Sequence, residues 1–99
     1  MLKITMICMG GISTKLMANK VEAAAKAIGD EVQITTTGIV DDYMALKDCD
    51  AVILAPQIRY AEKQIREDFG DVPLIVIEPM EYGTQNGASV YERLKKLMQ

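Results

Sequence analysis

Short runs of apolar residues alternate along the chain with longer segments whose apolar residues recur at helical spacing. Continuous apolar runs rich in β-branched and aliphatic residues are typical of parallel strands that are covered on both faces. The segments between them have the three- and four-residue spacing of helices. The predicted strands are residues 3–8, 32–36, 51–55 and 74–77, and the predicted helices are residues 14–28, 41–47, 59–69 and 87–98.

The predicted helices are marked by apolar stripes and by glycines that end them. Gly29 and Gly70 follow the first and third helices, where a residue past the last turn often adopts a left-handed backbone. We expect one stripe of each long helix to face the core. These stripes are Met17, Val21, Ala24 and Ile28 in the first helix, Ala61, Ile65 and Phe69 in the third, and Val90, Leu94 and Leu97 in the last.

The alternation of strands and helices predicts an α/β fold with an open, four-stranded parallel sheet, because right-handed crossovers join the strands. We expect the strand order 2-1-3-4, with helices on both faces, as in flavodoxin-like and tyrosine-phosphatase-like folds. Residues 1–99 form one predicted domain. Ligands of such sheets bind beyond the carboxyl ends of the strands at the switch point, here between strands 1 and 3. The loops after these strands should therefore face each other, with residues 78–86 beside them.

Composition and charge exclude several classes of function. A net charge of −3 argues against a nucleic-acid-binding surface. No apolar run approaches the ~20 residues that a membrane helix needs. The chain has no histidine, which excludes serine–histidine and cysteine–histidine catalysis within it and most zinc sites. We expect no metal, no cofactor, and a cytoplasmic protein whose two cysteines stay reduced.

The segment CMGGISTK, Cys8–Lys15, carries the candidate chemistry because it joins the first strand to the first helix. Gly10 and Gly11 allow backbone N–H groups to turn inward, and Ser13 and Thr14 can cap the helix. A helix N-terminus adds free N–H groups and the positive end of a dipole. Such an environment favours a thiolate, so Cys8 is a candidate nucleophile beside an anion pocket.

Other interpretations of this segment remain open on the residues alone. A cysteine at a strand end is often only a small buried hydrophobe, and glycines are common in turns. The nucleotide motifs GxxxxGK[ST] and GxGxxG are absent from the loop. Low-molecular-weight tyrosine phosphatases and arsenate reductases also begin with a cysteine loop, but they have an arginine six residues after the cysteine, where this chain has Thr14. The pocket could therefore belong to a phosphoryl carrier, to a hydrolase or thiol reductase, or to a non-catalytic anion sensor.

The whole chain resembles the IIB component of a bacterial sugar phosphotransferase system, of the lactose/cellobiose/chitobiose type. CMGGIST is similar to the family's Cys-x-x-Gly-Met-Ser-Thr loop. APQIRY, residues 55–60, and the pair Tyr82-Gly83 followed by Gly87 also match. The chain departs from the family at Met9, where Ser or Ala is common, at Lys15, where a small hydroxyl residue is common, and at Asn86, where an acid is common.

The resemblance implies a phosphotransferase subunit with a covalent intermediate. Cys8 would accept a phosphoryl group from a phosphohistidine of the IIA protein. It would pass the group to a sugar, expected to be a β-linked disaccharide, bound by the membrane IIC permease. We expect the chain to be monomeric alone and not to insert into the membrane itself. The implied phosphate-binding residues are Met9, Gly10, Gly11, Ile12, Ser13 and Thr14, and possible contacts to phosphate or partners are Lys15, Gln57, Arg59, Tyr60 and Tyr82.

The second cysteine, Cys49, has a structural role in this scheme. It precedes the third strand, so it belongs to the opposite end of the sheet from Cys8. About six residues of strand separate the two ends, which corresponds to roughly 20 Å. Because a disulfide needs Cα atoms within about 7 Å, we expect both thiols to be free.

Overall fold

The computed structural model describes residues 1–9 and 12–99, with only the backbone described for residues 12–14. Within these residues the four strands are connected by helical segments, which comprise four α-helices and two short 3-10 helices. The strands are β1 (Leu2–Cys8), β2 (Val32–Gly38), β3 (Ala51–Leu54) and β4 (Leu74–Val76). The helices are α1 (Ile12–Ala27), η1 (Tyr43–Leu46), η2 (Pro56–Ala61), α2 (Glu62–Phe69), α3 (Pro79–Gly83) and α4 (Gly87–Met98).

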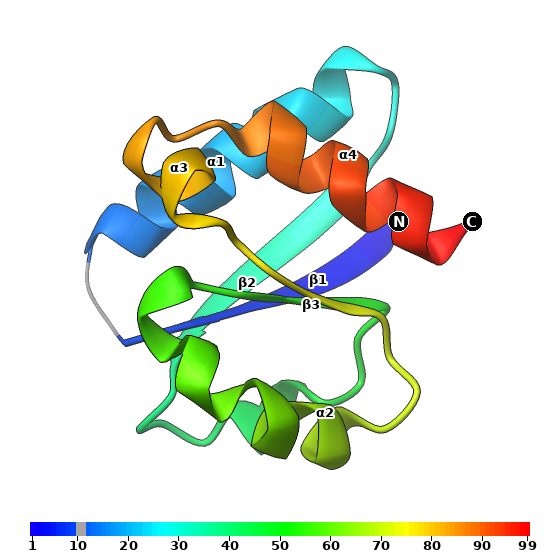
Figure 1. The fold of residues 1–99 in the computed structure, drawn as a ribbon. Coiled ribbons are helices and arrows are strands. Elements are labelled where there is room, and N and C mark those ends of the chain that lie inside the picture. Colours follow the sequence, from blue (N-terminus) through cyan, green and yellow to red (C-terminus); the bar gives the residue numbers. More distant parts are fainter. Residues whose placement is uncertain (10–11) are drawn as a thin grey trace.

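The predicted fold class is confirmed. All pairings are parallel and the strand order is β2-β1-β3-β4, so the switch point lies between β1 and β3. Helices α1, α3 and α4 lie on one face of the sheet, and η1, η2 and α2 lie on the other (Figure 1). The loops that follow the four strands gather at the left edge of this view, and both termini lie at the right.

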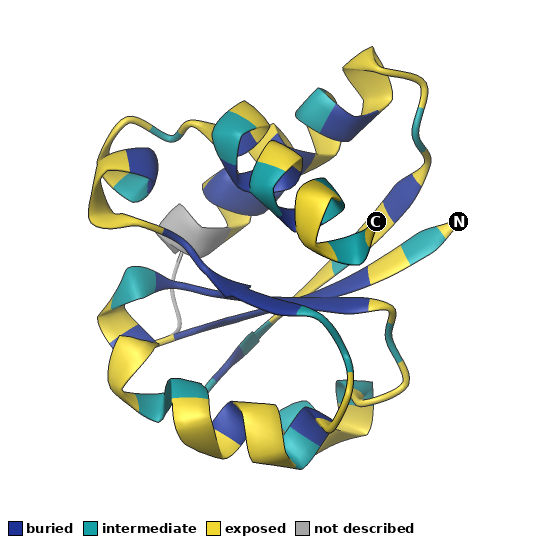
Figure 2. Cartoon of the chain, turned by 45° about the vertical axis from the view of Figure 1, so that its right-hand side comes forward, coloured by how far each residue is buried: buried dark blue, intermediate teal, exposed yellow. Residues whose placement is uncertain are grey.

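Each face of the sheet has its own buried cluster. Ile4 and Met6 of β1 pack with α1 and α4 in one cluster, the α1/α4 cluster. Ile7 packs with η2 and α2 in the other, on the α2 side of the sheet. This alternation follows from the two-residue period of side chains along a strand. Figure 2 shows the resulting buried sheet between helices whose outer faces are exposed. Strands β3 and β4, and β1 from Ile4 onward, are thus buried on both sides, as the continuous apolar runs predicted.

Several element boundaries differ from the prediction, and the differences are greatest after β3 and β4. The helix expected at residues 59–69 is preceded by the 3-10 helix η2, which begins at Pro56. Proline favours the first helical position because it has no N–H to leave unpaired. The segment 78–86, expected as a loop, contains the short helix α3 with Pro79 at its start. The helix expected at 41–47 is only the 3-10 turn η1.

Two of the residues expected to face the core are exposed. Ile28 is 61% exposed because α1 ends at Ala27, so its side chain leaves the apolar stripe. Leu97 is 52% exposed, and Met98 packs against the α1/α4 cluster in its place. The remaining predicted stripe residues are buried or half-buried. Gly29 and Gly70 have the positive φ angles, 83° and 68°, expected of residues that end helices.

Candidate functional site

Cys8 is the last residue of β1, at the carboxyl end of the sheet beside the switch point. It pairs with Gly38 of β2, and the N–H of Ile39 donates to its carbonyl oxygen at 2.7 Å. Its side chain is 4% exposed, and Sγ donates to the carbonyl oxygen of Thr37 at 3.4 Å. The backbone of Cys8 is therefore held by β2, and its thiol is covered and hydrogen-bonded.

The segment after Cys8 leads directly into α1. Met9 is 55% exposed. Gly10 and Gly11 lie outside the described residues, and so do the side chains of Ile12, Ser13 and Thr14. Helix α1 begins at Ile12, so its N-terminal turn follows Cys8 closely along the chain. Lys15 in this turn is exposed.

The loop after β2 contains a turn that the sequence analysis did not single out. The N–H of Gly38 donates to Oδ2 of Asp41 at 3.2 Å, and the N–H of Asp41 donates to the carbonyl oxygen of Gly38 at 3.0 Å. A Cβ atom at position 38 would lie 2.7 Å from Asp41 Oδ2, so a larger residue there would displace the side chain that accepts from the Gly38 N–H. The only sequence signal was a glycine at the end of a β-branched run with an aspartate three residues later. This turn fixes the strand that holds Cys8.

The loop after β3 meets the loop after β1, as the strand order predicted. Gln57, Arg59 and Tyr60 of η2 are exposed. The hydroxyl of Tyr60 lies 3.9 Å from Sδ of Met9. Tyr60 and Met9 are thus brought together, although the chain separates them by the whole of α1, β2 and β3.

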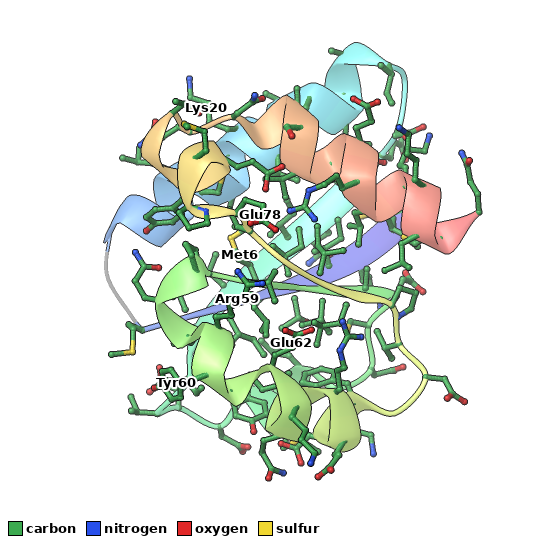
Figure 3. The ribbon with its side chains drawn as sticks, in the orientation of Figure 1. Met6, Lys20, Arg59, Tyr60, Glu62 and Glu78 are labelled. Atoms are coloured by element: carbon green, nitrogen blue, oxygen red, sulfur yellow. The ribbon has the colours of Figure 1, made fainter. Side chains whose placement is uncertain are left out.

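Arg59 turns instead toward the loop after β4. Its guanidinium lies 4.0 Å from the carboxylate of Glu78, and both side chains are more than half exposed. Figure 3 shows Arg59 and Glu78 next to each other, with Tyr60 further out on η2. Such an exposed pair contributes little to stability. Tyr82, in α3, is half-buried against the α1/α4 cluster.

An ion pair between a buried carboxylate and a partly exposed arginine, which the sequence analysis missed, anchors α3. Glu81 is 8% exposed, and Arg93 of α4 donates to its two carboxylate oxygens at 2.6 and 3.0 Å. Ser89 and the N–H of Glu78 also donate to this carboxylate, at 2.6 and 2.9 Å. Arg93 donates further to the carbonyl oxygen of Val76, at 2.9 Å. The pair therefore connects β4, α3 and α4, and it fixes the loop that flanks the switch point.

These contacts change the ionisation of Glu81. Burial alone raises the pKa of a carboxyl group, but the hydrogen bonds from Arg93, Ser89 and Glu78 and the charge of Arg93 outweigh it. The pKa of Glu81 is lowered from 4.5 to about 2. The network thus stabilises the folded protein only while Glu81 is ionised.

We expect this network to make stability depend on pH in the acid range. Because the folded-state pKa of Glu81 is about 2 and the ordinary value is 4.5, its contribution is complete above about pH 4.5. It is lost as the pH falls toward 2, with a total of about 3 kcal/mol. Urea unfolding of wild type and Glu81→Gln at several pH values gives the unfolding free energy of each as a function of pH. The contribution of Glu81 is the difference between the slopes of these two curves.

The control for this prediction is Glu92→Gln, which removes the exposed pair of Glu92 with Lys96 at 3.4 Å. We expect the unfolding free energy of Glu92→Gln to depend on pH as that of wild type does, and to differ from it by less than about 0.5 kcal/mol. If the unfolding free energy of Glu81→Gln fell between pH 5 and pH 2 as steeply as that of wild type, the acid-range pH dependence would not come from Glu81.

The two cysteines are both free, as predicted. Cys49 is half-buried and packs against the cluster on the α2 side. It lies just before β3, whose first residue Ala51 pairs with Ile4 near the amino end of β1. Cys8 and Cys49 are therefore at opposite ends of the sheet.

Among residues 1–9 and 12–99, no group of three or more His, Cys, Asp or Glu side chains is arranged to hold a metal ion. No helix in the same part of the chain has the length and apolar character needed to span a bilayer.

Comparison with known proteins gives consistent matches along nearly the whole chain. Residues 3–93 match the family described as "PTS system, Lactose/Cellobiose specific IIB subunit". The oligo-beta-mannoside-specific EIIB component of Bacillus subtilis is 31% identical over 100 residues, covering 99% of this chain and 97% of that protein. The cellobiose-specific EIIB component of Lactococcus lactis subsp. lactis is 28% identical over 102 residues, covering 96% and 94%.

Solved structures give the same fold. The cellobiose-specific phosphotransferase IIB component from Borrelia burgdorferi has a TM-score of 0.73 and 26% identity, covering 97% of this chain and 90% of that one. The lactose-specific IIB domain from Streptococcus pneumoniae has a TM-score of 0.83 and 21% identity, covering 99% and 98%. The chain therefore belongs to the lactose/cellobiose-specific IIB family, the phosphotransferase subunits of the sugar phosphotransferase system.

Proposed function

We propose that this protein is a cytoplasmic phosphoryl carrier in which Cys8 holds the phosphoryl group. The observation that most supports the proposal is the position of Cys8, the last residue of β1 at the switch point of the sheet. Ligands of open parallel sheets bind at this place. The N-terminal turn of α1 follows it, and free N–H groups there attract an anion.

The proposed reaction has two transfers. In the first, the N–P bond of a phosphohistidine on IIA breaks and an S–P bond forms at Cys8, and the thiol proton replaces the phosphoryl group on the released imidazole. In the second, the S–P bond breaks and an O–P bond forms on a hydroxyl of the sugar bound by IIC, and the hydroxyl proton restores the thiol. The chain contains no histidine, so the imidazole that takes part in the first transfer belongs to IIA.

Phosphorylation would also change the local contacts of Cys8. The thiol now donates its proton to the carbonyl oxygen of Thr37. A phosphorylated sulfur has no proton to donate, so Sγ must leave this acceptor. We propose that residues from Met9 to Thr14 then bind the phosphate, mainly through backbone N–H groups. Charge-assisted hydrogen bonds of this kind contribute roughly 1.5–3 kcal/mol each.

The alternative of a phosphatase is not favoured. Thr14 stands where those enzymes have an arginine, and each of the three arginines in the chain forms an ion pair with a glutamate. Without a guanidinium at the phosphate, hydrolysis lacks an important stabilisation of its transition state. We propose a β-linked disaccharide as the sugar, since relatives carry the names cellobiose-specific and oligo-beta-mannoside-specific.

The fate of the phosphoryl group tests the proposed function. Purified wild-type protein is mixed with phosphorylated IIA, and the phosphate is followed as free phosphate and as protein-bound phosphate. A carrier gains a stable, thiol-linked phosphoryl group. Release of inorganic phosphate would indicate a hydrolase, and no uptake would indicate an anion sensor, so either result contradicts the proposal.

The partner is proposed to dock on exposed apolar residues around Cys8. The loops after β1, β2 and β3 and the start of α3 each present one large apolar side chain to solvent. Their exposed fractions are 55% for Met9, 86% for Val40, 75% for Tyr60 and 77% for Met80. Apolar residues gathered around a reactive group are typical of a protein interface.

We expect the double variant Val40→Ser, Met80→Ser to raise KM for phosphorylated IIA about tenfold and to leave kcat unchanged, since it removes apolar contact area only. The measurement is the initial rate of phosphate uptake at several IIA concentrations. The control is Ile28→Ser, which changes a residue that is 61% exposed at the other end of the sheet. An equal rise in KM for the control would contradict docking at this surface.

A further inference from the structure

The two edges of the sheet differ in how their backbone groups are used. The β4 edge is only three residues long, and two arginine side chains cover it. Arg66 donates to the carbonyl oxygen of Leu74 at 3.4 Å, and Arg93 donates to that of Val76 at 2.9 Å. A short edge strand whose outward carbonyl groups are covered by side chains from neighbouring helices, here Arg66 of α2 and Arg93 of α4, is protected against pairing with another chain. The β4 edge is thus closed to strand addition.

The β2 edge has none of these protections. Its seven residues, VQITTTG, include no charged residue and no proline, and three of them are threonine. In a parallel pair the residues of one strand alternate between bonding to the neighbour and pointing away. Two bonds set this alternation, from Leu2 N–H to the carbonyl oxygen of Glu31 and from Ile39 N–H to that of Cys8.

It follows that even-numbered residues of β2 direct their backbone N–H and C=O groups outward. Gly38 is satisfied by Asp41 through both groups. The other three are Val32, Ile34 and Thr36, and within the described chain no protein group is hydrogen-bonded to their outward N–H and C=O groups. The free edge therefore consists of the outward N–H and C=O groups of three residues, with Val32 and Thr36 equally spaced on either side of Ile34.

This set is complementary to itself. If two copies of β2 pair antiparallel about a two-fold axis at Ile34, each Ile34 exchanges two hydrogen bonds with Ile34 of the second copy. Val32 of each copy then pairs with Thr36 of the other, so that all outward donors and acceptors of the three residues are satisfied. A shift of the register in either direction would leave some of these groups unpaired.

Side chains and charges are compatible with this pairing. Half-buried Ile34, at the border of the α1/α4 cluster, would meet its own copy across the axis. Gln33 would lie opposite Thr35 of the second copy, and both are exposed and uncharged. Because the pairing is antiparallel, the carboxyl ends of the two sheets point in opposite directions, and the Cys8 ends stay accessible. Isologous two-fold contacts of this kind are the commonest route to homodimers.

We propose that the β2 edge is a self-association site, at which a second copy of this chain adds to form one continuous eight-stranded sheet. The contact is small and is confined to one strand from each copy, so the dimer is weak and forms at high protein concentration. At low concentration the chain remains the monomer that the sequence analysis expects. The inference does not depend on the proposed role of Cys8.

Sedimentation equilibrium over a range of protein concentrations up to about 1 mM tests the proposal. The weight-average mass of wild type is expected to rise from 10.9 kDa toward twice that value. Thr36→Pro removes one outward N–H without removing a bond to β1, and such positions on edge strands accept proline. This variant is expected to stay at the mass of one chain, whereas Thr36→Ala should associate like wild type. A wild-type mass that stays at one chain, or association of folded Thr36→Pro equal to wild type, would overturn the proposal.

A charge-swap experiment keeps the proposal testable if Thr36→Pro fails to fold. Gln33→Lys with Thr35→Lys places lysines opposite lysines across the axis, and Gln33→Glu with Thr35→Glu does the same with carboxylates. Each double variant alone is expected to stay at the mass of one chain, and an equal mixture is expected to associate at least as strongly as wild type. Association of either double variant alone, or no association of the mixture, would contradict pairing at β2.

Discussion

Cys8→Ser is expected to accept no phosphoryl group from phosphorylated IIA within the time in which wild type is fully labelled. Serine keeps the size and hydrogen-bonding capacity of cysteine, so the acceptor at Thr37 can still be used. A hydroxyl is hardly ionised near neutral pH, and the chain has no histidine to take its proton. We expect a loss of rate of at least about a thousandfold, the size typical of the removal of an activated nucleophile.

Cys49→Ser is the matched control for this variant. Cys49 is half-buried at the opposite end of the sheet, so a hydroxyl there lowers stability by about 1 kcal/mol and leaves transfer unchanged. Circular dichroism establishes that both variants are folded. Transfer by Cys8→Ser, or loss of transfer by folded Cys49→Ser, would show that Cys8 is not the acceptor.

Gly87→Ala is expected to cause the largest loss of stability of any alanine substitution at a described glycine. A Cβ atom at Gly87 would overlap the carbonyl carbon of Lys20 and would lie 2.6 Å from both the Lys20 carbonyl oxygen and the backbone N of Val21. These are main-chain atoms of α1, which cannot rotate away as a side chain can. The α1–α4 pair must therefore separate, and we expect the free energy of unfolding to fall by about 3 kcal/mol.

Gly83→Ala provides the comparison, because a Cβ atom at Gly83 would meet nothing within 4 Å. Gly83 ends α3 and is exposed, so alanine there should change the unfolding free energy by no more than about 0.5 kcal/mol. Chemical denaturation of the two variants and wild type measures the difference. Equal stability of Gly87→Ala and Gly83→Ala would mean that α1 and α4 are not in backbone contact at this point.

The topology could be predicted from the sequence because it depends on local patterns. Runs such as Ala51–Leu54 are apolar without interruption, which is typical of a strand covered on both faces. Alternation with helices then restricts the strand order, and the order places Cys8 at the switch point. The meeting of Met9 with Tyr60 follows from the same reasoning, since both stand just beyond neighbouring strands.

The contacts that fix the loop after β4 could not be predicted in this way. Glu81 and Arg93 belong to different helices, and in the sequence each has the appearance of an ordinary solvated charge. Their pairing results from the packing of α3 against α4, which buries the carboxylate and leaves Arg93 as its partner. Long-range packing of this kind has no periodic signal. The exposure of Ile28 was also not predictable from the spacing of apolar residues, because that spacing continues to Ile28 although α1 ends at Ala27.

The chemical location of the phosphoryl group on wild-type protein tests the role of Cys8 most directly. The protein is labelled by phosphorylated IIA, digested under conditions that preserve S–P bonds, and analysed by mass spectrometry of the peptides. We expect one phosphoryl group on the peptide that contains Cys8, attached to sulfur, and its disappearance when IIC and sugar are added. A phosphoryl group on Ser13, Thr14, Cys49 or any other residue, with Cys8 unmodified, would contradict the proposal that Cys8 carries it.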